Sequence, residues 1–190
     1  MSTPWREQPL SRSHDRKSFD CGEPALNEFL ARYARQSHES GGAKSFVVVD
    51  PAAPQKILGY YSLSVGALAY ARTPALLTRG LGRYEVPVFR LGRLAVAREW
   101  QGQGMGGALL IAAGRRCIAV AQEVGGVALL IDAKSDRAAQ WYEGFGALRL
   151  EDAPLSLVLP LSTIAQAMAG AFAETLRMSR KFPCQESRRP

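Results

Sequence analysis

Glycines are concentrated in the segment RLAVAREWQGQGMGGALL, residues 93–110, where an apolar strand is expected to run into a helix. One set fits the spacing G-x-G-x-x-G, and its members are Gly102, Gly104 and Gly107. A second set fits Q-x-x-G-x-G, and its members are Gln101, Gly104 and Gly106. Glycines at a helix N-terminus leave backbone N–H groups accessible to an anion, and the helix dipole favours negative charge there. The segment therefore predicts a turn that holds phosphate, but the two spacings predict different enzymes.

The dinucleotide interpretation meets several objections. That fold needs its glycines near the start of a βαβ unit, an acidic residue about 20 positions further on, and a second mononucleotide half. Asp132 lies 25 residues after Gly107, strands are expected before the motif, and too little chain follows it for the remaining parallel strands. A P-loop needs lysine and a hydroxyl residue, whereas Ala108 follows Gly107. A tight turn with close helix packing is the purely structural alternative.

Hydrophobic periodicity predicts the elements that must position this turn. We expect a helix within residues 19–36 that has Pro24 near its first turn, and further helices over residues 104–125, 135–146 and about 162–178. Strands are expected over residues 44–50, 56–65, 86–96, 126–134, 147–150 and 155–161. The first two strands should form an antiparallel pair, and residues 66–86 should be a loop with a short helix. The order is α-β-β-β-α-β-α-β-β after an irregular start. We expect one domain over residues 1–161, with a C-terminal helix and basic tail, residues 162–190, appended to it.

Composition limits the class of protein. The chain has 190 residues and 47% hydrophobic residues, and no run approaches the ~20 apolar residues that span a bilayer. The N-terminus has no apolar signal core, so we expect a cytoplasmic protein without a membrane partner. The three cysteines, Cys21, Cys117 and Cys184, form no C-x-x-C pair, and only two histidines accompany them. We therefore expect reduced thiols and no metal.

The net charge of +7 is weak evidence for nucleic-acid binding, because the last 14 residues alone carry +4. From charge alone, a solvated face and a basic tail are the favoured interpretation.

The second glycine spacing and the element order resemble the GNAT acetyltransferase superfamily, whose acetyl-CoA signature is Q/R-x-x-G-x-G/A after a strand. The resemblance implies an α/β (α+β) fold with a mixed, twisted central sheet flanked by helices, and acetyl-CoA as co-substrate. It also implies that the strand before the turn splays from its neighbour and pairs with the pantetheine arm through Leu94, Ala95 and Val96. The Val96 N–H would polarise the thioester carbonyl. The residues that would hold the pyrophosphate are Gln101, Gly102, Gly104, Gly106 and Gly107.

The same resemblance implies a tyrosine on the following helix that protonates the departing CoA thiolate. In AAQWYEGFG, Tyr142 stands at the matching position. A phenol is protonated at neutral pH and can donate to a thiolate, because its reference pKa is about 10. The family usually has Gly-Phe after this helix, whereas here Ala147 follows Gly146.

Four further segments narrow the resemblance: HDRKSFDCGEPALNEFLARYARQ, ILGYYSLS, RLGRLAV and LLIDAKSDRAAQWYEGFG. Together they resemble the toxin acetyltransferases of the TacT and AtaT kind over about residues 11–168. This resemblance implies acetylation of the α-amine of aminoacyl-tRNA, a block of translation, and a ribbon-helix-helix antitoxin as partner. We also expect a homodimer. The arginines that would contact tRNA are foremost Arg93, then Arg90 and Arg83, with Arg72 and Arg79 as further candidates.

The residue types are compatible with a weakly basic acceptor. An α-amine has a reference pKa near 7.7 and needs no strong base, whereas a lysine amine near 10.4 does. The acidic candidates for such a base have no distinguishing context: Glu85, Glu99, Asp132 and Asp136. Two alternatives stay open. One is an N-acetyltransferase for a small-molecule amine or a protein lysine, and the other is a non-catalytic module that binds acetyl-CoA or an antitoxin.

Overall fold

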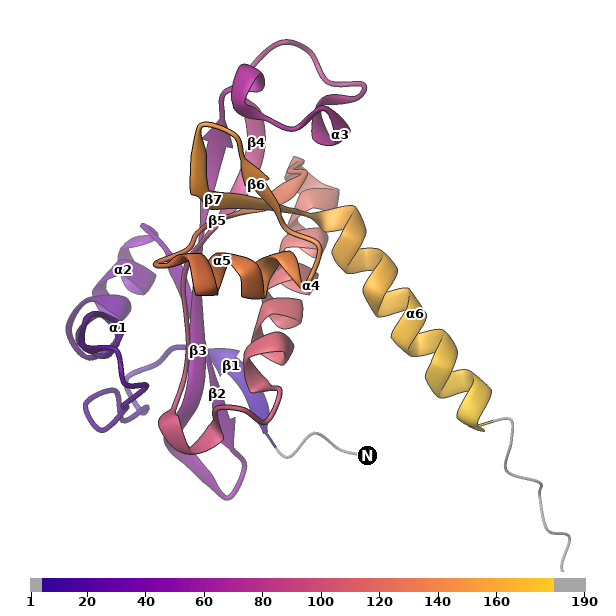
Figure 1. Cartoon of the computed structure of the whole chain (residues 1–190). Coiled ribbons are helices and arrows are strands. Elements are labelled where there is room, and N and C mark those ends of the chain that lie inside the picture. Colours follow the sequence, from indigo (N-terminus) through magenta and orange to yellow (C-terminus); the bar gives the residue numbers. More distant parts are fainter. Residues whose placement is uncertain (1–4, 180–190) are drawn as a thin grey trace, which may run out of the picture.

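A seven-stranded sheet runs through the chain in the order β1-β2-β3-β4-β5-β7-β6 (Figure 1). The computed structural model describes the backbone of residues 5–179 and the side chains of residues 5–170. The strands are β1 (Arg6–Pro9), β2 (Lys44–Asp50), β3 (Ala53–Leu68), β4 (Val86–Val96), β5 (Ala128–Asp132), β6 (Leu148–Leu150) and β7 (Ala153–Pro160). Neighbouring strands are antiparallel except β4 and β5, which are parallel. The predicted mixed sheet is confirmed.

Helices cover both faces of this sheet, with α1 and α2 on one face and α4 on the other (Figure 1). The α-helices are α1 (Pro24–Glu28), α2 (Ala34–Ser40), α3 (Ala75–Thr78), α4 (Met105–Val124), α5 (Asp136–Glu143) and α6 (Leu161–Ser179). Three short turns join them to neighbouring elements: the π-helical η1 (Phe29–Tyr33) and the 3₁₀ turns η2 (Tyr70–Arg72) and η3 (Arg98–Trp100). In the part of the chain that the structure describes, no helix is apolar over enough length to cross a membrane.

Strand β3 shows how the two faces share the core. Successive side chains of a strand point to opposite faces, so Tyr60 packs with Leu30 under α1 and α2, while Tyr61 packs with Leu109 under α4. Both tyrosine rings are fully buried. The sheet is therefore a rigid support whose two faces are closed by different helices.

The structure corrects the sequence-based elements in two places. The N-terminal stretch expected to be irregular contains β1, an edge strand paired with β2. Its sequence REQP offers no β-branched residue, and its anchor is Glu7, which accepts hydrogen bonds from Tyr61 and Arg116. Strands β3 and β4 also pair as far as Leu68 and Val86, so the predicted loop with its short helix is shorter than residues 66–86.

Candidate active site

Strands β4 and β5 are paired over only three residues. Phe89, Arg90 and Leu91 of β4 face Leu129, Leu130 and Ile131 of β5. Beyond this point β4 continues to Val96 and pairs with β3 alone. The register between β3 and β4 shifts at Gly92, which is the extra residue of a β-bulge. Because a bulge bends its strand, the sheet splits between β4 and β5 at Gly92. The splayed strand that the resemblance implied is present.

The hydrogen-bond pattern decides which backbone groups face this split. Residue pairs of an antiparallel ladder alternate between hydrogen-bonded and non-hydrogen-bonded. The Ala97 N–H donates to the Leu58 carbonyl at 2.8 Å, so this pair is of the hydrogen-bonded kind. Two residues earlier, Ala95 opposes Tyr60 in the same phase. The N–H and C=O of Ala95 therefore point toward β3 and not into the split.

Leu94 and Val96 occupy the alternate positions, so their backbone groups point away from β3. The Val96 carbonyl accepts a hydrogen bond of 2.9 Å from the Gln101 side chain, which also donates to the Cys21 carbonyl at 2.9 Å. The Val96 N–H is left as a donor on the open side of β4. The side chain of Gln101 ties the turn to β4 and to the FDCG segment, so only its backbone is available to a pyrophosphate.

The glycines of the turn divide into two kinds. Gly102 and Gly104 have φ angles of +74° and +83°, and a Cβ at either position would meet nothing within 4 Å. Gly106 and Gly107 instead lie against α5, because a Cβ there would approach the rings of Trp141 and Phe145 at 3.4 and 3.1 Å. The first pair thus shapes the loop and opens it to solvent. The second pair permits close helix packing.

Helix α4 begins at Met105, and because its N-cap residue is Gly104 it has no side-chain cap. The first backbone N–H groups of a helix have no acceptor within the helix, and its dipole gives that end a partial positive charge. The first turn of α4, next to the end of the open half of β4, therefore has the backbone geometry that favours an anion.

Tyr142 lies on α5, whose N-terminus is capped by Ser135: its hydroxyl accepts a hydrogen bond of 3.2 Å from the Ala138 N–H. The Tyr142 ring stacks edge-on against Trp141 and packs against the cluster that contains Val96. Burial raises the pKa of Tyr142 to about 12. Within residues 5–170 its hydroxyl has no hydrogen-bond partner, so it is a protonated donor at neutral pH. Ala147 is buried in the same cluster and fits this packing.

The π-helical turn η1, which sequence reasoning missed, lies on the face of the sheet opposite α4. The Ala34 N–H bonds to the Phe29 carbonyl, five residues back, and the widened turn holds the Phe29 ring against Tyr60. The Arg93 guanidinium lies 4.7 Å from the centre of the Phe29 ring. Such turns are frequent at functional sites, but one inserted residue in a helical pattern leaves no clear sequence signal.

The predicted tRNA-contacting arginines are not all brought together. Arg90 and Arg93 lie on the same face of β4, opposite the side chains that pack under α4. Arg90 forms an ion pair with Asp132, whose carboxylate also accepts a hydrogen bond from Ser156 at 2.7 Å. Arg83 lies apart, in the loop before β4 beside the 82% exposed Tyr84.

The other arginine candidates lie in or near the same loop: Arg72 bonds to Asp152, and Arg79 follows α3.

Cysteine chemistry plays no part in the site. Cys21 is buried and its thiol donates to the Asn27 side chain at 3.1 Å. Burial raises the pKa of Cys21 and raises that of Cys117 to about 12, so both thiols are protonated. Cys184 lies outside the described residues. Within those residues, no group of three or more His, Cys, Asp or Glu side chains is placed to hold a metal ion.

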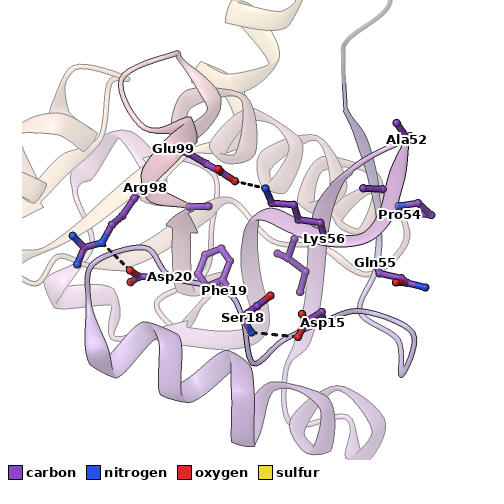
Figure 2. A pocket seen from close by; sticks show the side chains of 13 residues that line it. Asp15, Ser18, Phe19, Asp20, Ala52, Pro54, Gln55, Lys56, Arg98 and Glu99 are labelled. Carbon is purple, nitrogen blue, oxygen red and sulfur yellow. Dashed lines mark hydrogen bonds and ion pairs between the residues drawn. The ribbon is translucent and has the colours of Figure 1, made fainter.

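A cavity of about 790 Å³ borders η3, and Figure 2 shows the side chains that line it. It lies between the N-terminal segment around Phe19, the β2–β3 hairpin and η3. Two ion pairs cross its lining: Arg98 with Asp20, at 2.9 Å, and Lys56 with Glu99, at 2.7 Å. Both pairs hold η3, which leads directly into the glycine turn. The two ion pairs of the cavity lining therefore fix the position of the segment that leads into the glycine turn.

Comparison with known proteins agrees with this geometry. The chain matches the family described as acetyltransferase (GNAT) domain over residues 42–146. It is 36% identical over 161 residues to a tRNA-acetylating toxin of Mycobacterium tuberculosis, which covers 85% of this chain and 94% of that protein.

Solved structures of one toxin are similar over almost their full length. AtaT complexed with acetyl-methionyl-tRNAfMet superimposes with a TM-score of 0.80 at 26% identity, covering 86% of this chain and 99% of that one. A mutant of AtaT bound to acetyl-CoA and the C-terminus of the antitoxin AtaR has a TM-score of 0.74 at 25% identity, with 87% and 99% covered.

Proposed function

Because the chain belongs to the GNAT acetyltransferase family, we propose that it is a toxin that acetylates the α-amine of aminoacyl-tRNA with acetyl-CoA and so blocks translation. The observation that carries the proposal is the free Val96 N–H on the open half of β4, beside the uncapped start of α4. The acceptor is inferred from the relatives, which include the tRNA-acetylating toxin and AtaT with its acetylated tRNA.

The backbone of this chain holds the donor. The N–H groups at the start of α4, together with the turn at Gly102, Gly104, Gly106 and Gly107, bind the pyrophosphate. Leu94 and Val96 pair with the pantetheine arm as a neighbouring strand would. Ala95 spaces these two residues, and Gln101 fixes the turn in place. The proposed binding set thus consists of Leu94, Val96 and the four glycines, while Ala95 and Gln101 support it without side-chain or backbone pairing to the pantetheine arm.

The transfer is a direct attack. The free α-amine adds to the thioester carbonyl, whose oxygen accepts a hydrogen bond from the Val96 N–H as negative charge develops on it. The C–S bond then breaks, and the Tyr142 hydroxyl donates its proton to the CoA thiolate. The amine proton leaves to solvent, and Tyr142 is reprotonated from water. No acyl-enzyme is formed, which agrees with the protonated state of the buried cysteines.

The acidic residues favour an α-amine over a lysine as acceptor. Glu99, Asp132 and Asp136 are each held in an ion pair, with Lys56, Arg90 and Arg149 respectively. A carboxylate that already contacts a cation is not positioned to take the proton of a lysine amine, and an α-amine needs little help because much of it is already deprotonated near neutral pH.

The remaining partners follow from the same relatives. Acceptor tRNA approaches the face that carries Arg93 and Arg90, with Arg83 reaching the duplex further along. By extension from the AtaT–AtaR complex, a ribbon-helix-helix antitoxin binds this toxin and neutralises it.

The protein acts as a homodimer in the cytoplasm, where charged tRNA is found. Residues 1–161 form the catalytic domain, and residues 162–190 are its appendage.

An acceptor panel tests the proposal. Labelled acetyl-CoA is offered with aminoacyl-tRNA, uncharged tRNA, a lysine peptide and small amines. Label on charged tRNA alone supports the proposal. Label on the peptide or on small amines contradicts it in favour of another acetyltransferase. Acetyl-CoA binding without any product contradicts it in favour of a binding module.

A further inference from the structure

An ion pair joins the two sides of the open half of the split. The Lys134 ammonium belongs to the loop between β5 and α5, and it contacts the carboxylate of Glu23. Glu23 directly precedes α1, which lies on the face of the sheet opposite α4 (Figure 1). The two side chains are 57% and 47% exposed, so both charges are accessible to a substrate.

Glu23 lies close to the Val96 backbone. The Gln101 side-chain nitrogen donates at 2.9 Å to the carbonyls of both Val96 and Cys21, so these two oxygens are at most about 6 Å apart. Glu23 follows Cys21 by two residues, a span of roughly 7 Å at most. The carboxylate that meets Lys134 therefore stands near the end of β4, where the Val96 N–H faces the split.

The backbone that carries Glu23 is firmly held. Its carbonyl accepts hydrogen bonds from the Leu26 and Asn27 N–H groups, both at 3.0 Å. The Asn27 side chain donates to Asp20 at 2.8 Å, and Asp20 forms its ion pair with Arg98 of η3 at 2.9 Å (Figure 2). The FDCG segment thus fixes Glu23 relative to the glycine turn, and only the Glu23 side chain is left to adjust.

The backbone of Lys134 is held on both sides as well. The Ala133 N–H donates to the Leu155 carbonyl at 2.7 Å, and Ser135 caps α5. Helix α5 also carries Tyr142. Lys134 therefore has a fixed position relative to the acid of the proposed transfer.

We propose that the Glu23–Lys134 pair binds the aminoacyl end of the acceptor, with the Glu23 carboxylate on the α-amine and the Lys134 ammonium on the ester carbonyl oxygen. The proposal rests on the proposed function, because it needs aminoacyl-tRNA as acceptor. It adds two acceptor-binding residues that lie outside the glycine signature, and it gives a reason why an α-amine is preferred to a lysine amine.

The pair matches an α-amino ester in its two polar groups. In such an ester one carbon atom joins the amine to the carbonyl carbon, so the nitrogen and the carbonyl oxygen lie side by side. A carboxylate only accepts hydrogen bonds and an ammonium only donates them, so Glu23 suits the amine and Lys134 suits the carbonyl oxygen. A lysine side chain has no carbonyl beside its amine. A site built to hydrogen-bond a group discriminates strongly against a compound that lacks it.

Opening the pair for a substrate costs little, because water screens an exposed ion pair and leaves it a small contribution to stability. The contact with Glu23 orients the nitrogen lone pair toward the thioester carbonyl at Val96. The amine proton still leaves to solvent, so the pair adds no covalent step to the transfer.

Kinetics with charged tRNA at saturating acetyl-CoA test the assignment. Glu23→Gln and Lys134→Gln should each lower kcat/KM for charged tRNA roughly tenfold, as the loss of one charge-assisted contact predicts, and leave KM for acetyl-CoA unchanged. The matched control is Glu28→Gln, which removes another exposed ion pair of the same segment, with Arg32 at 3.2 Å. It should change neither constant. Wild-type constants in both Glu23→Gln and Lys134→Gln would overturn the proposal.

A charge exchange separates acceptor binding from a purely structural ion pair. The double variant Glu23→Lys with Lys134→Glu keeps an ion pair across the split, but it places an ammonium where the amine must lie. Its melting temperature should stay near that of the wild type, while transfer to charged tRNA stays at least as low as in the single variants. Recovery of the wild-type rate would assign the pair to structure alone and overturn the proposal.

Binding of a deaminated acceptor tests the contact with the amine. Nitrous acid converts charged tRNA to α-hydroxyacyl-tRNA, which keeps the ester carbonyl and loses the amine. Without acetyl-CoA, the wild type should bind charged tRNA roughly tenfold more tightly than the deaminated form. Glu23→Gln should bind both equally, and Glu28→Gln should keep the preference. Equal binding by the wild type, or a preference that survives in Glu23→Gln, would overturn the assignment of Glu23.

The two proposals fail in different ways. Transfer to charged tRNA by the wild type, with unchanged constants in the Glu23 and Lys134 variants, refutes the acceptor-binding pair alone. Absence of transfer to charged tRNA by the wild type refutes both.

Discussion

The two halves of β4 differ in what their backbones do. Residues 86–91 have β3 on one side, and over Phe89–Leu91 they have β5 on the other, so their hydrogen bonds are used in holding the sheet. Residues 92–96 have β3 alone, and the Leu94 backbone groups and the Val96 N–H face the split. One strand thus serves as core and as binding surface, and the bulge at Gly92 separates the two uses.

This difference predicts that truncating a side chain costs more stability in the closed half of β4 than in the open half. Leu91→Ala removes a buried side chain from the doubly paired half, and it should lower the free energy of unfolding by about 3 kcal/mol. Leu94→Ala changes a partly buried side chain in the open half and leaves its backbone free, so the loss should be about half as large. Urea denaturation measures both. Equal losses would mean that the open half is packed as tightly as the closed half.

The turn after the open half can be tested by a pair of glycines. Gly104→Ala and Gly41→Ala both place a methyl group at positive φ in open space, so each should cost about 1 kcal/mol of stability. Only Gly104→Ala should weaken acetyl-CoA binding, by roughly tenfold. Calorimetric titration of both variants separates loss of fold from loss of binding. Weakened binding in Gly41→Ala as well would assign the effect to the fold.

The variant Gln101→Ala tests whether the Gln101 side chain, through its bond to the Val96 carbonyl, positions the turn. Gln101→Ala removes two hydrogen bonds, to Val96 and to Cys21, each worth about 1 kcal/mol. We expect a several-fold rise in KM for acetyl-CoA, with a smaller change in kcat, because the variant loosens the turn and leaves Tyr142 in place. A loss confined to kcat would contradict the positioning role.

On the acceptor face, Arg93→Gln should raise KM for charged tRNA and lower the salt dependence of binding by about one unit of slope. Arg35→Gln, which removes an exposed helix ion pair with Glu39, should change neither. Kinetics at several salt concentrations measure both variants. An unchanged slope for Arg93→Gln would remove Arg93 from the tRNA contacts.

The pH dependence should be the smallest effect. The pKa of Tyr142 is raised from 10 to about 12 by burial, so the acid stays protonated throughout the working range. The rate should rise with pH as the acceptor amine, near 7.7, loses its proton, and then stay level to about pH 10. The same raised pKa means that Tyr142 contributes stability fully below pH 10 and loses it as the pH rises toward 12. A fall in rate below pH 10 would assign the acid to another group.

Much of this site could be predicted from the sequence because its motif residues lie in two short stretches, residues 93–110 and 138–146. The glycine spacing, the strand before it and Tyr142 on the next helix are local patterns, and the structure places them around one split. The bulge at Gly92 and the π-helical turn at Phe29 each depend on one extra residue accommodated by neighbouring elements. The sequence therefore carried no clear signal for either.

Long-range contacts explain the other differences. Strand β1 forms because Glu7 meets Arg116 and Tyr61, residues far away in the chain. Ala95 and Gln101 were assigned to acetyl-CoA from their position in the motif. The phase of the β3–β4 ladder and the approach of Cys21 gave them other partners.

We propose that Tyr142 and the open half of β4 together perform acetyl transfer to aminoacyl-tRNA. The most direct test is single-turnover transfer from labelled acetyl-CoA to charged tRNA by the wild type and by Tyr142→Phe, with acetyl-CoA binding measured alongside. We expect label on charged tRNA and not on uncharged tRNA, a rate at least about 100-fold lower in the variant, and unchanged acetyl-CoA affinity. Equal rates for the two proteins, or label on uncharged tRNA, would contradict it.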